Sequence, residues 1–552
     1  MKHMSWAVGP SLGLYATLAS AAESSATSAK ACCKALELAG LAHVLYPDND
    51  LYHNRTLSYW SVSAQLSPTC IIQPTSTEEV SKAVRTIVKD ARCGQDHFAI
   101  RSGGHTTWAG SNNIDGGVTI DLGLMNTTTL NDQTNVASIQ PGSRWNQVYA
   151  TLDPTGLTVA GGRAGSVGVA GFLTGGGNSF YTAQQGFACD TVTNFEIVIA
   201  SGGVINANAT NNPDLFQALK GGSGTNFGIV TRFDMQAFEA GHLWGGTMVY
   251  PKSVGQQHVE AYHAWTNNVN NYPEGSSIIF WSYLPDMGDI MILAAYEDTA
   301  GNIAPSGFDQ VMAIPGALAS TMRTASHKEL TDELEQPAGY RDLWYTLTFK
   351  NDIRIYEKII ELHEKFVEDW KAETSEPDFI TQCMFQSIAT SFSKHSVAKG
   401  GNVLGLEKET GNVVMLLLNI AVKSPELEAR AKNRLHACGE AMRKYAASLD
   451  GLVAWTYLNY ADGSQDPLGS YGSENIAKIR STAAKYDPDQ FFQLRVPGGF
   501  KISRHDQQHT HVCNKLIVGN LASRRTPFNI QASEETGSHV DWSPERKYWE
   551  RL

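Results

Sequence analysis

The chain of 552 residues has little positive charge and few long apolar runs. Lys and Arg number 43 against 55 Asp and Glu, which gives a formal net charge of −12. Because proteins that bind a phosphate backbone need clustered cations, this balance argues against nucleic acid as a partner. No segment reaches the roughly 18 consecutive apolar residues of a membrane span, and the strongest run, residues 413–422, carries Asn419 and predicts a buried strand. A soluble protein with no membrane partner is expected.

Several signatures of catalysis and nucleotide binding are also missing. The glycines at 222, 224 and 228 have the wrong last spacing for a GxGxxG turn, and no P-loop, GxSxG elbow or CxxC pair occurs. His363-Glu364 lacks the second histidine of HExxH, because Val367 stands in its place. The sequence therefore excludes an ordinary Rossmann domain, a serine hydrolase of the elbow type and a zincin, and no metal site is predicted.

The two ends of the chain predict processing and disorder rather than catalysis. Residues 1–22 form a short, interrupted apolar stretch that closes on Ala-Ser-Ala, which is typical of a secretory signal peptide; a disordered leader is the alternative. Sequons at Asn54, Asn126 and Asn208 favour the secretory route and a secreted or lumenal protein. Residues 505–552 contain histidines and a cysteine without a periodic apolar face, so a disordered tail is preferred to a metal cluster.

The eight cysteines leave the redox state open. A bridge from Cys32 or Cys33 to Cys70 would fix the N-terminal segment, residues 30–66, to the first domain. Reduced, buried thiols are the alternative.

Periodicity predicts an α+β protein of two domains. In residues 67–236, a strand at 70–72, a helix that begins with a capping box of Ser76 and Glu79, and a strand at 98–100 form a βαβ unit, and further short strands follow at 118–122, 136–139 and 195–200. In residues 237–450, strands at 247–250, 278–284, 291–296 and 413–422 alternate with helices at 356–370 and from 425 past 445. This pattern predicts an antiparallel sheet covered by helices, forming a substrate domain.

Glycine is the clearest functional signal. The 50 glycines are about 9% of the chain, above the usual roughly 7%, and they concentrate between Gly103 and Gly228. Three blocks stand out, at residues 101–110, 161–177 and 221–228. Successive glycines let backbone N–H groups converge on an anion such as a pyrophosphate, so even an acidic protein can hold one.

These blocks carry a family resemblance. RSGGH at 101–105, DGGVTIDL at 115–122, GFACD at 186–190 and LKGG at 219–222 resemble the berberine-bridge-enzyme family of FAD-linked oxidases, within the vanillyl-alcohol-oxidase fold group. YLNY at 457–460, YG at 471–472 and YDP at 486–488 are similar to its last module, residues 451–504. The resemblance covers residues 30–504. It implies a two-part FAD-binding domain of the PCMH type, completed by the last module.

The resemblance implies a role for each matching residue. His105 resembles the histidine that bonds the flavin 8α-methyl group, and Ala164 stands where the family has a second, cysteine tether, so a single covalent bond to FAD is predicted. Val167 matches the position beside the oxygen-access face, where a small residue favours reoxidation by O2. The other residues expected to contact the cofactor are Arg101, Ser102, Gly103, Gly104, Gly168, Gly228 and Asn459.

Hydride transfer from a substrate C–H to flavin N5 needs a base for the neighbouring OH or NH. Tyr460 is the first candidate, with Tyr457 or Asp462 as alternatives, although a phenol titrating near pH 10 needs help to act at neutral pH. If both tyrosines only pack against the flavin, the base is another group.

The resemblance is strongest to members of fungal natural-product pathways. It implies a monomeric oxidase of an alcohol, phenol, alkaloid-like or polyketide-like small molecule that uses O2 and releases H2O2. Two rivals remain: a carbohydrate oxidase, in which Trp244 and Trp281 could stack on sugar rings although core packing suits them better, and a pericyclic cyclase that binds FAD without net redox chemistry.

Overall fold

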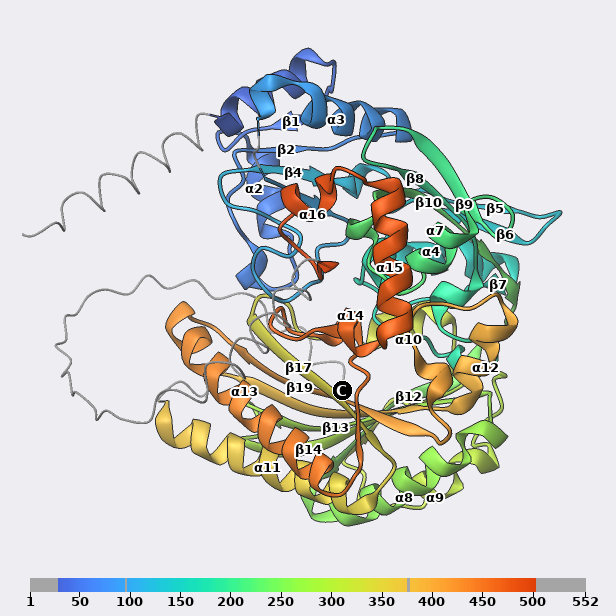
Figure 1. Cartoon of the computed structure of the whole chain (residues 1–552). Helices are drawn as coiled ribbons and strands as arrows, with labels where there is room; N and C mark the ends of the chain where they lie inside the picture. The colour runs from blue at the N-terminus through green and yellow to red at the C-terminus, as the bar shows by residue number, and fades with distance from the viewer. Residues whose placement is uncertain (1–27, 95–96, 375–377, 503–552) are drawn as a thin grey trace, which may run out of the picture.

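The computed structural model describes residues 28–94, 97–374 and 378–502, and their elements form an upper and a lower part (Figure 1). Sheets made before residue 237 lie in the upper part, and one large antiparallel sheet with its helices forms the lower part. The α+β fold class predicted from the sequence is confirmed. The predicted signal peptide (1–22) and tail (505–552) lie outside the described residues.

Two sheets form the frame of the upper part. The first has the order β1-β2-β4-β3, with β1 antiparallel and the others parallel, and its strands are β1 (Val44–Leu45), β2 (Cys70–Ile72), β3 (Phe98–Arg101) and β4 (Val118–Asp121). The second is antiparallel, in the order β5-β6-β10-β8-β9, with β5 (Thr128–Asn131), β6 (Val136–Ile139), β8 (Val192–Val198), β9 (Val204–Asn208) and β10 (Ile229–Gln236). Strands β7 (Leu157–Thr158) and β11 (Phe238–Glu239) pair separately.

The predicted βαβ unit is present, with one detail different. Helix α3 (Thr77–Lys89) joins β2 to β3, and the Ser76 hydroxyl accepts the N–H of Glu79 at 3.3 Å. The Glu79 carboxylate accepts from Thr75 instead of closing a capping box on Ser76. Strands β2 and β3 both pair with β4, which lies between them, so the first glycine-rich loop leaves β3 at the sheet edge.

The lower part is built on one antiparallel sheet. Within the described residues its strands are β12 (Leu243–Pro251), β13 (Gly275–Leu284), β14 (Asp289–Asp298), β15 (Ala319–Ser320), β16 (Arg323–Ala325), β17 (Arg341–Lys350), β18 (Ile380–Ile388), β19 (Val413–Val422) and β20 (Leu452–Val453). Helices α11 (Ile353–Glu373) and α13 (Pro425–Ser448) cover its outer face (Figure 1). Ile359, Phe366 and Trp370 of α11 are buried, as the helical periodicity predicts.

The remaining helices connect the two parts or cover the sheet edges. They are α2 (Asp50–Leu57), α4 (Trp145–Leu152), α5 (Val169–Thr174), α6 (Thr182–Gln185), α7 (Pro213–Leu219), α8 (Gly255–Asn268), α9 (Asp309–Met312), α10 (His327–Glu333), α12 (Thr390–Ala398), α14 (Pro467–Ser470), α15 (Ser473–Tyr486) and α16 (Phe491–Arg495).

The C-terminal segment returns to the upper part, where α15 runs beside α7 (Figure 1). Lys485 of α15 pairs with Asp214 at 2.7 Å. Arg495 of α16 donates to the carbonyls of Ile87 and Cys93 at 3.0 and 3.1 Å. The C-terminal segment therefore packs on the sheets of the upper part, although the whole lower part separates the two in sequence.

Two disulfides hold the N-terminal segment. Cys33 pairs with Cys70, one of the pairings expected, and Cys32 pairs with Cys93. Further along the segment, the Trp60 N–H donates to the Gly104 carbonyl at 3.1 Å, and Val62 N–H donates to the Tyr340 carbonyl at 2.8 Å. The segment thus joins the first glycine-rich loop to the lower part.

We expect the double variant Cys33→Ser/Cys70→Ser to lose about 2–4 kcal/mol of unfolding free energy, because the unfolded chain gains conformations when this cross-link is removed. Denaturant unfolding followed by circular dichroism measures the loss. Cys438→Ser, which removes a thiol outside the disulfides, is the control, and equal midpoints for the two variants would contradict the prediction.

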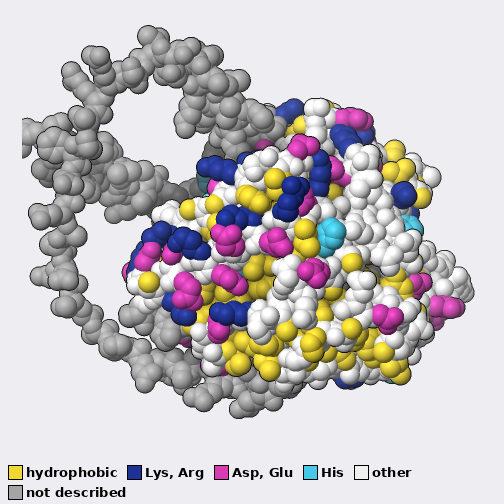
Figure 2. Space-filling view, turned by 90° about the horizontal axis from the view of Figure 1, so that it is seen from below, with side chains coloured by type: hydrophobic (Ala, Val, Ile, Leu, Met, Phe, Trp, Pro, Cys, Tyr) yellow, Lys and Arg dark blue, Asp and Glu magenta, His cyan; other side chains and the backbone are white. Residues whose placement is uncertain are grey.

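Positive and negative side chains are interspersed on the face seen from below (Figure 2). Ion pairs along α11 include Lys358–Glu361 and Lys365–Asp369. Among the described residues, no helix has the length and apolar character that crossing a bilayer requires.

Candidate active site

A cavity of about 950 Å³ lies between the two parts, at the upper end of the usual range for small-molecule sites. One end is lined by residues 102–108, 223–225 and 499–500, and the other by the inner face of the lower sheet. Loops of the middle glycine block and the YLNY motif lie between them. All three glycine-rich blocks singled out from the sequence therefore open on one space.

The first two glycine blocks contact each other through their backbones. A Cβ on Gly103 would lie 2.5 Å from the Cα of Gly168, and one on Gly168 would lie 2.4 Å from the nitrogen of Gly103. Gly104 has a φ of +70°, and a Cβ there would meet the Arg101 guanidinium at 2.8 Å. Glycine is required at these positions because any side chain would separate the loops that line the cavity.

We expect Gly168→Ala to weaken FAD retention and to lower the unfolding free energy by about 1–3 kcal/mol, the usual cost of overpacking. The contact is between two backbones, so no side chain can rotate to relieve it. Bound flavin per protein after gel filtration and a thermal melt measure the two effects. Gly411→Ala, whose Cβ would meet no atom within 4 Å, is the control, and a yellow, fully stable Gly168→Ala protein would contradict the prediction.

His105 is a half-buried, neutral imidazole at the cavity wall. Its ring stacks on Trp60 with centroids 4.6 Å apart and planes at 14°. Burial, with the nearby Arg144 guanidinium, lowers the pKa of His105 to about 3. Its Nε2 lies 3.1 Å from the Ser166 hydroxyl, and Trp60 and Ser166 are contacts that the sequence analysis missed.

Arg101 shapes the first glycine loop from behind. It is 1% exposed, and its guanidinium donates to the carbonyls of Arg55 and Ser58 at 2.6 and 3.0 Å and lies 3.7 Å from the centre of the Tyr59 ring. Its side chain is absent from the cavity lining, whereas Ser102 lines the cavity and donates to the Pro141 carbonyl at 2.6 Å. We therefore assign Arg101 to positioning the loop instead of the cofactor contact expected from the sequence.

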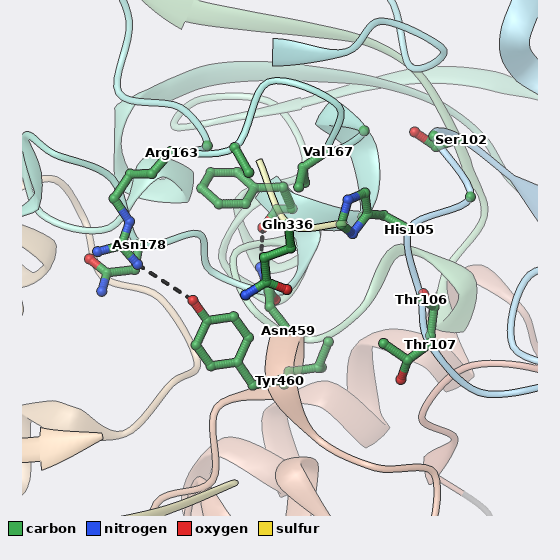
Figure 3. A pocket seen from close by; sticks show the side chains of 18 of the residues that line it. Ser102, His105, Thr106, Thr107, Arg163, Val167, Asn178, Gln336, Asn459 and Tyr460 are labelled. Atoms are coloured by element: carbon green, nitrogen blue, oxygen red, sulfur yellow. Dashed lines mark hydrogen bonds between the residues drawn. The ribbon is translucent and has the colours of Figure 1, made fainter. Parts of the chain in front are cut away.

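Tyr460 lies in the centre of the cavity wall, with its hydroxyl directed toward Arg163 and Asn178 (Figure 3). Gln386 Nε2 donates to the Tyr460 hydroxyl at 3.1 Å, and Arg163 Nη2 donates to it at 3.5 Å. Arg163 also donates to Gln386 Oε1. These two donors come from the middle glycine block and from β18, and the sequence analysis did not identify either.

The other two candidate bases are less suitable. The Tyr457 hydroxyl accepts the N–H of Asn178 at 2.8 Å, and burial raises the pKa of Tyr457 well above its ordinary value. The Asp462 side chain is absent from the cavity lining and accepts from Ser464 at 2.6 Å. Burial alone would raise the Asp462 pKa, but hydrogen bonds from His436 and Ser464 outweigh it and lower the pKa to about 2. Asp462 is therefore misplaced and too weakly basic for the expected role.

The remaining predicted contacts line the cavity. Val167, Gly168, Gly228 and Asn459 are all in its wall. Asn459 donates to the Phe172 carbonyl at 3.1 Å, and its buried Oδ1 has no hydrogen-bond partner among the described residues. Such an acceptor suits a bound polar molecule.

The inner face of the lower sheet forms an apolar wall. Leu293, Phe280, Met384 and Leu417 are direct partners across β14, β13, β18 and β19, so they form one row. Trp344 continues this wall and contacts Tyr460 edge-on at 5.4 Å. Gln382 interrupts the wall and accepts from Gln336 at 2.9 Å. Trp244 and Trp281, proposed as sugar-stacking residues, are buried and absent from the cavity lining, so core packing is their role.

The cavity fits a flavin dinucleotide. Its long glycine-backbone wall suits an anionic pyrophosphate, its unpartnered Asn459 Oδ1 suits an N–H or O–H donor of the cofactor, and its apolar end leaves room for a substrate. No group of three or more His, Cys, Asp or Glu in the described part of the chain is arranged to hold a metal ion.

Comparisons with known proteins define the class. Residues 68–208 match the family described as "FAD binding domain". The structure is similar to berberine bridge enzyme in complex with (S)-reticuline (TM-score 0.67, 17% identity, covering 85% of this chain and 98% of that one). It is similar to the xylooligosaccharide oxidase of Myceliophthora thermophila with xylobiose (TM-score 0.67, 19% identity, 85% and 99% covered). The fold and the cavity are those of an FAD-dependent oxidoreductase.

A curated relative defines the family. The "FAD-dependent monooxygenase drtC" of Aspergillus calidoustus is 38% identical over 480 residues, which are 86% of this chain and 90% of the relative. The chain belongs to the berberine-bridge-enzyme-like family of FAD-linked oxidoreductases. The resemblance seen in the sequence is confirmed.

Proposed function

We propose that this enzyme is an oxidase that removes a hydride from a small, largely apolar alcohol or phenol of natural-product metabolism and uses O2 as the electron acceptor, releasing H2O2. The observation that carries the proposal is the single cavity in which Tyr460 lies between the glycine-rich cofactor end and the apolar sheet face. Bound FAD would supply the hydride acceptor at N5 and return the electrons to O2.

The apolar wall supports an aromatic or polyketide-like substrate. Phe280, Leu293 and Met384 form an apolar surface against which a flat ring system can pack. Gln382 and Gln336 supply a localised polar contact, which suits a carbonyl or hydroxyl substituent. A sugar would require many hydrogen-bonding partners, and the row Phe280, Leu293, Met384 and Leu417 offers none, so we favour the aromatic class over a carbohydrate against this row. The polar lining residues Thr321, Arg323, Asp332 and Glu333 come from the segment at 321–333 and not from the row.

Tyr460 is the proposed base for the substrate hydroxyl. Its oxygen accepts hydrogen bonds from Gln386 and Arg163, and the Arg163 cation lies beside the atom on which negative charge would develop when the phenol loses its proton. To act as the base, the Tyr460 phenol must first give up its own proton; the phenolate then takes the substrate O–H proton and becomes the neutral phenol again. Removing the substrate O–H proton strengthens hydride donation from the adjacent carbon.

His105 is the proposed single covalent tether. The imidazole lines the cavity and is neutral, so a nitrogen lone pair is available to form the bond. Ala164 lines the same wall where a second tether would need a thiol. Val167, also in the wall, supports the proposal of O2 access.

We further propose that the protein folds in the secretory pathway. The two disulfides support an oxidising compartment. Asn54 and Asn126 are exposed, as a glycan would require, whereas Asn208 is half-buried and bonded to Asn194 at 3.0 Å.

A monooxygenase is the second candidate, and it is favoured by the 38% identical relative, which is named an FAD-dependent monooxygenase. The two reactions differ in the destination of the oxygen atoms. An oxidase releases one H2O2 per O2 consumed, whereas a monooxygenase places one oxygen atom of O2 in the product.

The deciding experiment has two stages. Acid precipitation of the purified protein, followed by a visible spectrum of the pellet, tests for covalent flavin. An oxygen-electrode screen of alcohols, phenols and oligosaccharides, with H2O2 assay and 18O2 labelling, tests the reaction. We expect a yellow pellet, an amount of H2O2 released equal to the amount of O2 consumed, and no 18O in the product. Labelled product would establish the monooxygenase, and substrate conversion without O2 uptake would establish a cyclase.

A further inference from the structure

Glu335 connects the lower part of the molecule to the His105 loop. It follows α10 and accepts the Ser166 hydroxyl on Oε2 at 2.6 Å and the Ser166 N–H on Oε1. The same hydroxyl lies 3.1 Å from His105 Nε2. Carboxylate, hydroxyl and imidazole therefore form a continuous hydrogen-bonded chain at the cavity wall.

The direction of these bonds determines which imidazole nitrogen is reactive. The Ser166 hydroxyl has one proton, which it donates to Glu335, so toward His105 its oxygen can only accept. Nε2 of His105 must then carry the N–H, and Nδ1 carries the lone pair. Stacking on Trp60 holds the ring in this orientation.

We propose that Glu335, acting through Ser166, is the positioning residue for covalent attachment of the flavin: it holds His105 with Nδ1 as the nucleophile and receives the proton that leaves Nε2. This inference rests on the tether given in the proposed function. It adds a pair of residues that prepare the cofactor and take no part in substrate oxidation.

Attachment would form a bond between His105 Nδ1 and the flavin 8α carbon and break one C–H bond of that methyl group. The methyl proton would leave to solvent, and the Nε2 proton would pass to Ser166 as the Ser166 proton passes to Glu335. The two electrons would reduce the bound flavin, and O2, the co-reactant, would take up these two electrons with two protons and form H2O2.

The surroundings explain why an acceptor is needed. Without proton loss, the attached imidazole would be a half-buried cation beside Arg144, whose guanidinium donates to the carbonyls of Ser166 and Gly103. Burial, opposed by the Ser166 hydrogen bonds, raises the pKa of Glu335, so its carboxylate takes up a proton more readily than an exposed one.

The test follows attachment and does not require a substrate. FAD is added in air to flavin-free full-length protein, and samples are taken over time for acid precipitation and for in-gel flavin fluorescence. We expect Glu335→Gln and Ser166→Ala to bind FAD, as judged by flavin absorbance, but to attach it about 10²-fold more slowly than the wild type, the lower range for loss of a proton acceptor. Glu335→Asp restores a carboxylate and should recover part of the rate. Glu361→Gln, an exposed carboxylate on α11, is the matched control.

Four outcomes would overturn the proposal. If both Glu335→Gln and Ser166→Ala attached FAD at the wild-type rate, proton transfer from His105 through Ser166 to Glu335 would be excluded. A flavin-bearing peptide linked through Nε2 would reverse the assigned nitrogen. Loss of all FAD binding in both variants, with the fold checked by circular dichroism, would make the pair structural. Free flavin in acid-treated wild type would refute both the tether and this inference, while an active oxidase with dissociable FAD would leave the rest of the proposed function standing.

Discussion

Replacing Tyr460 with Phe should slow reduction of the flavin by substrate about 10²-fold or more, because the variant lacks the group that takes the substrate proton. The phenol is suited to this role by its two donors, Gln386 at 3.1 Å and the Arg163 cation at 3.5 Å. Anaerobic stopped-flow mixing with the best substrate from the panel measures the effect. Reoxidation of the reduced enzyme by O2 should keep its normal rate, since that step needs no substrate base.

Tyr457→Phe is the matched control. It removes a hydroxyl that accepts the Asn178 N–H at 2.8 Å within the buried wall, so it should cost about 1–3 kcal/mol of stability through an unpaired donor and leave flavin reduction nearly unchanged. If Tyr460→Phe reduced its flavin at the normal rate and Tyr457→Phe did not, the role of base would move to Tyr457.

Replacing His105 with Ala should abolish covalent flavin altogether. The variant should still bind FAD, because the glycine backbones at Gly103 and Gly168 form the cavity wall independently of the imidazole. After acid precipitation the yellow colour should move from the pellet to the supernatant, and dilution followed by gel filtration should strip part of the cofactor.

The neighbouring histidine His97 offers a control, since it lies outside the cavity lining. His97→Ala should keep its flavin in the pellet. Yellow colour in the pellet of His105→Ala would show that another nucleophile forms the bond.

Sequence periodicity was sufficient to predict most of the frame. The strand at 413–422 coincides with β19, and the helix from Pro425 coincides with the start of α13, because long apolar runs and proline at a helix start are local signals. The glycine-rich blocks are local signals too, and they predicted which residues line the glycine-rich end of the cavity. Local patterns of this kind need no knowledge of the tertiary contacts.

The sequence could not identify the partners that act across the fold. Glu335 lies 169 positions from Ser166, and Gln386 lies 74 positions from Tyr460. No sequence pattern distinguishes Glu335 or Gln386 from the other polar residues of the chain, which has 55 acidic residues alone. Asp462 shows the converse: closeness in sequence to Tyr460 made it a candidate, but its side chain points to Ser464 and His436.

Most of the cross-strand row on the lower sheet is independent of the residues proposed for the redox step. Phe280 and Leu293 stand on β13 and β14, whereas His105 lies in a loop and Tyr460 in the short 3-10 helix Leu458–Tyr460. Met384 is the exception, because its sulfur accepts from the same Gln386 Nε2 that donates to Tyr460. Side chains on a strand can change without moving its backbone, so a library restricted to Phe280, Leu293 and Leu417, with Met384 kept, is the natural starting point for altering substrate scope.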